Sequence, residues 1–165
     1  MSNQPGGTGK VRVGDKAPDF TLPSQDGTPV RLYDLLGTRA VVLFFYPKDH
    51  SKNCTIEACA FRDSYEVFTQ AGAEVIGISM DSAESHAAFA AHNRLPFLLL
   101  SDTAGAVRRL YGVPPTLGIM PGRVTYILDT QGMVRKLVAP LLQPAQHVTE
   151  SLAIVQQIAA AGSRS

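Results

Sequence analysis

The stretch AVVLFFYPKDHSKNCTIEACAF, residues 40–61, contains both cysteines of the 165-residue chain, Cys54 and Cys59. It begins with a continuous apolar run, Ala40 to Tyr46, that is rich in β-branched and aromatic side chains and ends at Pro47. Such a run is typical of a strand that is buried on both faces of a sheet. The stretch therefore predicts a central strand, then a loop, then a segment that carries the two thiols.

After the loop, apolar residues recur at spacings of four and three, as on one face of a helix. These residues are Cys54, Ala58, Phe61, Tyr65 and Phe68. The pattern predicts a helix that runs to about Gln70 and has Cys54 at its N-terminus. There the helix dipole and unpaired backbone N–H groups favour a thiolate over a thiol, so Cys54 is a candidate nucleophile. A small buried hydrophobic cysteine would fit the same position.

Predicted strands and helices alternate along the rest of the chain. The further strands are expected at residues 74–80, 97–102, 124–129 and 133–139, and the further helices at 82–95, 104–111 and 144–162. Two short apolar stretches around Asp26–Gly27 predict an N-terminal hairpin. Together these elements predict an α/β layered domain with a central mixed sheet.

The composition limits the number of domains and the kinds of partner. With 165 residues, 45% of them hydrophobic, the chain is expected to form a single domain at 11–162, preceded by a flexible N-terminal arm at 1–10. The formal net charge is only +1. The basic pairs Arg108–Arg109 and Arg135–Lys136 lie inside periodic segments, so we expect solvated faces and no nucleic-acid partner.

The N-terminus MSNQPGGTGK lacks the apolar core of a signal peptide, and no apolar run approaches the roughly 20 residues of a membrane span. We therefore expect a cytoplasmic protein without a membrane partner. In such a chain two cysteines do not suggest a structural disulfide framework. Redox chemistry or a metal site is left open.

The segment FFYPKDHSKNCTIEACAFRD resembles the active-site segment of the peroxiredoxins, whose signature is Pro, three residues, Thr, two residues, Cys. Pro47 and Cys54 match this signature, and Ser51 stands where the family usually has Thr. The stretches PFLLLSD and GRVTYILD are also similar to the family, and the second places Arg123 at its active-site arginine. The four residues between Cys54 and Cys59 resemble the Q-type, or bacterioferritin-comigratory, subfamily.

The resemblance implies a thioredoxin-like three-layer α/β/α fold and a thiol peroxidase without cofactor or metal. Cys54 would reduce hydrogen peroxide and organic hydroperoxides and become a sulfenic acid, and Cys59 would resolve it as an intramolecular disulfide. Arg123 would hold the thiolate and the peroxide, the Ser51 hydroxyl would hydrogen-bond substrate or thiolate, and Pro47 would shield the pocket. Thioredoxin or a glutaredoxin-type dithiol would recycle the enzyme, which we expect to be a monomer.

Four residues near Cys54 add expectations. Lys52 and Asn53 stand where Q-type members commonly have Pro-Gly, which puts in question how the loop is held. We expect His50 to be a solvated loop residue. Glu57 matches an acidic residue common in the subfamily, which would either orient a proton or favour the first helical turn, and we expect mainly the second role.

The alternatives are a copper-delivery protein of thioredoxin-like fold, another redox-linked binding protein, and a redox-inert interaction domain. A copper protein of this type would pair a CxxxC motif with a distant histidine, since thiolates and imidazole suit copper. This chain has CxxxxC, and its helical segments carry His86, His92 and His147 without a matching motif.

The spacing of the two cysteines also predicts a conformational change. In a continuous α-helix, residues five apart are separated by about 7.5 Å of rise and about 140° of rotation. A disulfide needs Cα atoms within roughly 7 Å. We therefore expect the helix to unwind around Cys54 before it can bond to Cys59.

Overall fold

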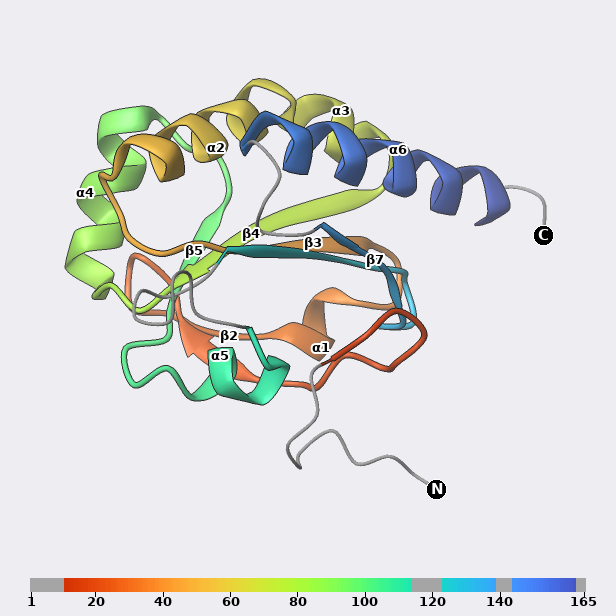
Figure 1. The fold of residues 1–165 in the computed structure, drawn as a ribbon, viewed down its shortest axis with the longest axis horizontal. Helices are drawn as coiled ribbons and strands as arrows, with labels where there is room; N and C mark the ends of the chain where they lie inside the picture. Colours follow the sequence, from red (N-terminus) through yellow and green to blue (C-terminus); the bar gives the residue numbers. More distant parts are fainter. Residues whose placement is uncertain (1–10, 114–122, 139–143, 163–165) are drawn as a thin grey trace.

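The fold is built around β3, Ala40–Phe45, whose six residues are all buried. The computed structural model describes residues 11–113, 123–138 and 144–162 (Figure 1). It places β3 in the middle of a five-stranded sheet of order β5-β4-β3-β6-β7. The sheet is mixed, because β4 pairs with β3 in parallel and β6 pairs with it antiparallel. The predicted central strand and mixed sheet are confirmed.

The other four strands of the sheet follow the predicted segments. They are β4 Ala73–Ser79, β5 Leu98–Ser101, β6 Val124–Leu128 and β7 Val134–Val138. A separate antiparallel pair, β1 Thr21–Pro23 and β2 Pro29–Arg31, forms the predicted N-terminal hairpin. Gly27 in its turn has a φ of 85°, a conformation that glycine adopts without strain.

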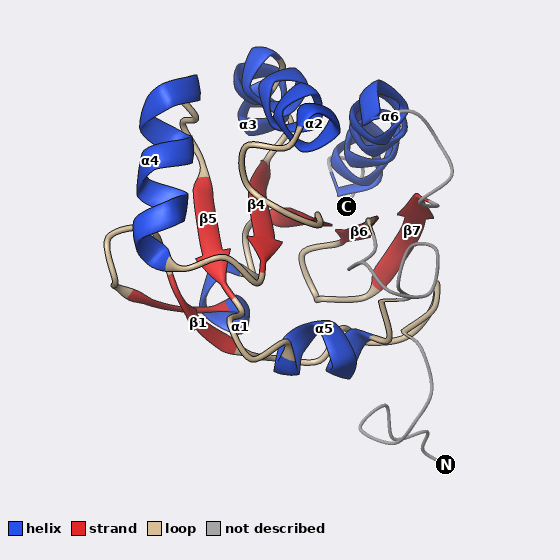
Figure 2. Cartoon of the chain, turned by 60° about the vertical axis from the view of Figure 1, so that its left-hand side comes forward, coloured by secondary structure: helices blue, strands red, loops and turns tan. Residues whose placement is uncertain are grey.

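Helices cover both faces of the sheet, which confirms the three-layer α/β/α arrangement (Figures 1 and 2). One layer contains α2 Lys52–Asp63, α3 Tyr65–Gln70, α4 Ala83–Asn93 and α6 Pro144–Gly162. The other contains α1 Leu32–Leu35, α5 Ala106–Tyr111 and the hairpin. Alternate side chains of β3 enter the two cores: Val42 and Phe44 pack under the first layer, and Leu43 and Phe45 under the second.

The helix predicted as one element to about Gln70 is two helices, α2 and α3, separated by Ser64. Ser64 leaves helical geometry, with φ −103° and ψ 3°, and its N–H is shared between the carbonyls of Ala60 and Phe61. The apolar spacing did not reveal the break, because Phe61 before it and Phe68 after it are buried in the same core. Serine is a weak helix former, which is consistent with a bend there.

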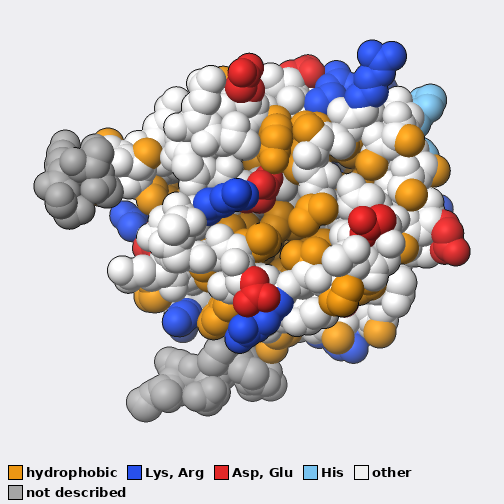
Figure 3. All heavy atoms as spheres, turned by 180° about the vertical axis from the view of Figure 1, so that it is seen from behind, with side chains coloured by type: hydrophobic (Ala, Val, Ile, Leu, Met, Phe, Trp, Pro, Cys, Tyr) orange, Lys and Arg blue, Asp and Glu red, His pale blue; other side chains and the backbone are white. Residues whose placement is uncertain are grey.

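The predicted start of α4 is confirmed, since the Ser82 hydroxyl accepts a hydrogen bond from the Ser85 N–H. The predicted arm at 1–10 lies outside the described residues, so the division into an arm and a domain stays a prediction. None of the helices in the described ranges combines the length and the apolar composition needed to cross a bilayer. On the face drawn in Figure 3, hydrophobic side chains gather in a central hollow, and positive and negative side chains are interspersed around it.

A close contact in the centre of the sheet gives a stability prediction. Gly77 in β4 lies opposite Phe44 of β3 and Leu99 of β5. A Cβ at this position would lie 2.7 Å from Phe44 Cζ and 2.9 Å from Leu99 Cδ2. We expect Gly77→Ala to lower the free energy of unfolding by about 1–3 kcal/mol in urea titrations. The exposed control Gln70→Ala should stay within about 0.5 kcal/mol of wild type; an equally unaffected Gly77→Ala would contradict the assigned packing.

Candidate active site

The two residues at the centre of the site, Cys54 and Arg123, are brought together by the sheet. Cys54 is the third residue of α2, which follows the loop after β3, and Arg123 directly precedes β6. β6 runs antiparallel to β3 and pairs Val124 with Phe45, the last residue of β3. Arg123 therefore lies at the C-terminal end of β3, where the loop to α2 begins. Its Nη2 donates a hydrogen bond to Cys54 Sγ at 3.2 Å. Both side chains are buried.

A carboxylate, Glu57, occupies the other side of the Arg123 guanidinium. Arg123 Nη1 donates to Glu57 Oε1 at 2.5 Å, and Glu57 is fully buried one turn after Cys54. Burial raises the pKa of Glu57 to about 7, and the attraction of Arg123 opposes this rise. Burial acts to lower the pKa of Arg123, but Glu57 and Cys54 outweigh it and raise that pKa. The guanidinium therefore stays charged and is oriented by both partners.

The expectation that Glu57 mainly favours the first helical turn is wrong. It is the sixth residue of α2, and the first turn holds no acidic residue. A signal for its role was present in the sequence, because Glu57 stands three residues after Cys54, next to Ala58 on the apolar face. A carboxylate on such a face needs a buried partner of opposite charge.

His147 connects α6 to the same cluster, although the sequence analysis assigned it no role. The side chain is buried, and its Nδ1 lies 2.7 Å from Thr125 Oγ1 and 3.4 Å from Glu57 Oε2. The apolar stripe of α6 shows that this position is buried, since Val148 and Val155 are buried as well. That stripe does not show which residue His147 meets.

Arg108 was expected on a solvated face, and the structure contradicts this. It is 7% exposed, and its Nη2 donates to the carbonyl oxygen of Tyr46, directly before Pro47. Its guanidinium also lies over the Phe45 ring, 6.0 Å from the centroid. Burial lowers the pKa of Arg108. The other member of the pair, Arg109, is exposed as expected.

The loop between β3 and α2 contains two more of the site residues predicted from the sequence, Pro47 and Ser51. Pro47 is half-buried. Ser51 is the N-cap residue of α2, but its hydroxyl donates to the Lys48 carbonyl at 3.1 Å. The Ser51 carbonyl accepts hydrogen bonds from the hydroxyl and the N–H of Thr55. In this conformation the Ser51 hydroxyl therefore holds the loop and not the Cys54 sulfur.

A buried carboxylate, Asp49, anchors this loop, whereas Lys52 and Asn53, which stand where Q-type members have Pro-Gly, are the first two residues of α2. Its Oδ1 accepts from the Tyr46 hydroxyl at 2.6 Å, and its Oδ2 lies 2.7 Å from Ser85 Oγ and 2.8 Å from His86 Nδ1. Burial raises the pKa of Asp49, but the bonds from His86 and Tyr46 outweigh this and lower it. The expected exposure of His50 is confirmed.

Within the described ranges, one group of side chains has the spacing of a metal site: Asp49, Asp81 and His86, whose ligand atoms lie within 4.8 Å of one another. Hydrogen bonds already occupy these atoms. Asp81 Oδ2 accepts from the Asp49 N–H and the Ser79 hydroxyl, and His86 Nε2 lies 3.0 Å from the Leu100 carbonyl. The donor set therefore fits a loop anchor better than a metal ligand set, and it includes neither cysteine.

Cys59 lies five residues after Cys54 in the same helix, is half-buried and carries a free thiol, as does Cys54. Its Sγ faces the side-chain oxygen of Asn93 in α4 at 3.7 Å. The structure therefore shows both cysteines in one continuous helix, as the spacing argument assumed.

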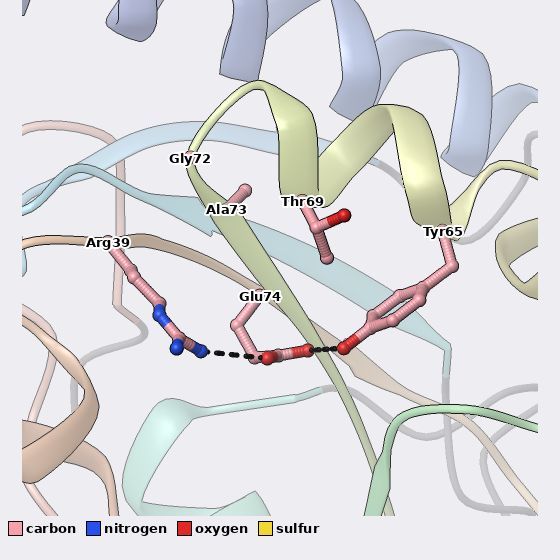
Figure 4. Close-up of a pocket in the computed structure, with 6 residues that line it drawn as sticks. All are labelled: Arg39, Tyr65, Thr69, Gly72, Ala73 and Glu74. Carbon is pink, nitrogen blue, oxygen red and sulfur yellow. Dashed lines mark hydrogen bonds and ion pairs between the residues drawn. The ribbon is translucent and has the colours of Figure 1, made fainter.

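A surface pocket of about 240 Å³ lies elsewhere, beside α3 and the beginning of β4 (Figure 4). Arg39 and Tyr65 reach into it from opposite sides and meet Glu74, at 3.0 Å and 2.7 Å. Ala40 and Ala73 begin the parallel strands β3 and β4. The pocket therefore lies at the N-terminal end of these strands, whereas Cys54 lies beyond the C-terminal end of β3. We do not assign it to the reaction.

Comparisons with known proteins agree with this geometry. The model of the AhpC/TSA family matches residues 13–137. The chain is 52% identical over 151 residues to the chloroplastic peroxiredoxin Q of Triticum aestivum, which covers 91% of this chain and 69% of that protein. The corresponding protein of Sedum lineare is 51% identical over 150 residues, covering 90% and 80% of the two chains.

Solved structures give the same result. The crystal structure of peroxidoxin BcpB from Mycobacterium tuberculosis matches with a TM-score of 0.84 and 38% identity, covering 90% of this chain and 98% of that one. A structure of the Xanthomonas campestris bacterioferritin comigratory protein, whose alkyl peroxide reduction activity was studied, matches with a TM-score of 0.77 and 29% identity, covering 85% and 92%.

The buried Glu57 carboxyl gives a prediction about stability and pH. Burial raises its pKa from 4.5 to about 7, so between these values the folded protein binds more protons at Glu57 than the unfolded chain does. The free energy of unfolding therefore falls over this interval as the pH rises. Glu57→Gln should remove the fall. The unfolding free energy of the variant minus that of wild type should increase by roughly 3 kcal/mol from pH 4.5 to 7 in urea titrations.

The exposed control Glu66→Gln should give a constant difference from wild type over the same pH range. A constant difference for Glu57→Gln as well would mean that Arg123 keeps Glu57 ionised throughout, and would contradict this prediction.

Proposed function

Because the chain belongs to the AhpC/TSA family, in its peroxiredoxin Q branch, we propose that it is a thiol peroxidase that uses Cys54 to reduce hydroperoxides. The observation that carries the assignment of Cys54 is the hydrogen bond from Arg123 to its buried sulfur, at the N-terminal turn of a helix. A guanidinium and a helix N-terminus at one thiol both stabilise its thiolate. Hydrogen peroxide and organic hydroperoxides are the proposed substrates.

In the first step the Cys54 thiolate attacks one oxygen of the hydroperoxide, an S–O bond forms and the O–O bond breaks. Cys54 becomes a sulfenic acid, and the departing alkoxide or hydroxide takes a proton from water to leave as an alcohol or water. Arg123 faces the sulfur and donates to it, so it is placed to stabilise negative charge as it develops on the peroxide oxygens. We propose that Pro47 and Ser51 act by shaping and holding the loop over this site.

In the second step the Cys59 thiolate attacks the Cys54 sulfenic sulfur, so that an S–S bond forms, the S–O bond breaks and hydroxide leaves as water. The two cysteines share one continuous helix, so this step requires the helix to unwind around Cys54. We propose a dithiol reductant of the thioredoxin or glutaredoxin type, and a monomeric enzyme, which light scattering would test. The cytoplasmic location expected from the sequence stays a prediction.

The copper-delivery alternative is not favoured by the comparisons, which all point to peroxiredoxins. The histidine contacts do not favour it either. His86 lies against Asp49 and the Leu100 carbonyl, and His147 lies against Thr125 and Glu57.

The roles of the two cysteines can be separated by substitution. Cys54→Ser should abolish peroxide consumption, because no nucleophile remains. Cys59→Ser should reduce about one equivalent of peroxide per chain and then stop at the sulfenic acid, which further peroxide converts to the sulfinic acid. Peroxide consumption and intact mass should be measured side by side. Wild-type turnover by Cys54→Ser would disprove the assignment.

The unwinding can be observed directly by amide hydrogen exchange. We expect the N-terminal turns of α2, from Cys54 onward, to exchange faster in the disulfide form than in the reduced form, because their backbone hydrogen bonds are lost. The strand β3, whose residues are all buried, serves as an internal control that should stay protected in both forms. Equal protection of α2 in both forms, with the Cys54–Cys59 disulfide verified by mass spectrometry, would refute the unwinding.

A further inference from the structure

The contact between Cys59 and Asn93 joins α2 to α4, the two helices that lie side by side in Figures 1 and 2. Asn93 is the last residue of α4, and its side-chain oxygen lies 3.7 Å from Cys59 Sγ. This is the range of an S–H···O hydrogen bond, in which the thiol is the donor.

The orientation of the Asn93 amide is fixed by its second contact. Asn93 Nδ2 donates to the backbone carbonyl of Phe89 at 3.0 Å. A carbonyl accepts hydrogen bonds only, so the NH₂ group must face Phe89 and the oxygen must face the sulfur. The Cys59 sulfur therefore meets a hydrogen-bond acceptor, to which it can bond only while it carries its proton.

The proposed second step needs the opposite form, because only a thiolate attacks the Cys54 sulfenic acid. We propose that Asn93 is a positioning residue for the resolving step, which holds Cys59 as a thiol and so slows disulfide formation. This inference rests on the proposed peroxidase function. In the step itself the Cys59 proton goes to solvent, the S–S bond forms, and the Cys54 S–O bond breaks to release water.

A second contact fixes the half of α2 that carries Cys59. Arg62 Nη1 donates to the Asn93 backbone carbonyl at 2.8 Å, and the adjacent Phe61 is buried and stacked on Phe44 with centroids 4.6 Å apart. The second half of α2 is therefore fixed to α4 and to the sheet, while Lys52 and Asn53 at its beginning are exposed. The half of α2 that carries Cys59 therefore stays in place, and the unwinding brings Cys54 to it.

Among the described residues, the charged and titratable groups beside this contact lie at the ends of α2 and α4. On α2 they are Arg62 and Asp63, which form an ion pair with each other. Next to Asn93 in sequence they are His92 of α4 and its C-cap residue Arg94. Arg62 is the one bonded to Asn93, and it is retained in the variants below.

Two substitutions at Asn93 should act in opposite directions. Asn93→Ala removes the acceptor and should speed the resolving step about three- to tenfold at pH 7. Asn93→Asp places a carboxylate beside the Cys59 sulfur and should slow the resolving step by a similar factor. The pH at which the resolving rate reaches half its maximum should move down in Asn93→Ala and up in Asn93→Asp. A loosened α4 would shift both variants in the same direction.

The experiment is a single turnover of the full-length protein with one equivalent of hydrogen peroxide. The chain contains no tryptophan, so samples should be quenched with a thiol-alkylating reagent and resolved by intact mass into thiol, sulfenic acid and disulfide. The first step should stay within about twofold of wild type in both variants, and Asn93→Asp should accumulate more sulfinic acid under excess peroxide. The exposed Gln70→Glu, with the same charge change, should match wild type in both steps.

Changes of the resolving rate in the same direction for both variants, or a wild-type resolving rate that does not depend on pH, would overturn the proposal. Failure of the proposed function is a separate result, since wild type would then form no sulfenic acid at all.

Discussion

The structure of the site depends on one guanidinium that is shared between a sulfur and a carboxylate. Arg123 donates to Cys54 with one nitrogen and to Glu57 with the other. Burying an ion pair is costly unless its geometry and further hydrogen bonds compensate, and here the planar fork of arginine meets both partners at once. The arrangement needs β6 to place Arg123, α2 to present Cys54 and Glu57 one turn apart, and α6 to enclose the carboxylate with His147.

The sequence predicted the parts of the fold that follow from local patterns. The apolar run of β3, the cap at Ser82 and the hairpin turn are local features, and all three are confirmed. The resemblance also directed attention to Arg123, whose position beside Cys54 no spacing rule would give, since the two residues are 69 positions apart. Periodicity shows that a side chain is buried but does not name its partner. For this reason Glu57 was assigned to the first helical turn, His147 was given no role, and Arg108 was assigned to solvent.

The loop before α2 shows a second limit of the sequence comparison. Lys52 and Asn53 in place of Pro-Gly put in question how the loop is held, but both residues lie in α2 and the loop is held by its own Asp49. Asp49 collects hydrogen bonds from Tyr46, Ser85 and His86, which reach it from β3's end and from α4. A buried carboxylate whose hydrogen bonds are satisfied restrains the backbone through contacts that are distant in the sequence.

The enclosure of Glu57 by α6 has a consequence for the order of events during protein synthesis. Chains fold from the N-terminus as they are made, so β3 and α2 leave the ribosome long before residue 147. Until α6 docks, one side of the carboxylate that orients Arg123 lacks the cover that His147 provides. Cys54 is thus translated early, whereas the site around it is complete only after most of the polypeptide has been translated.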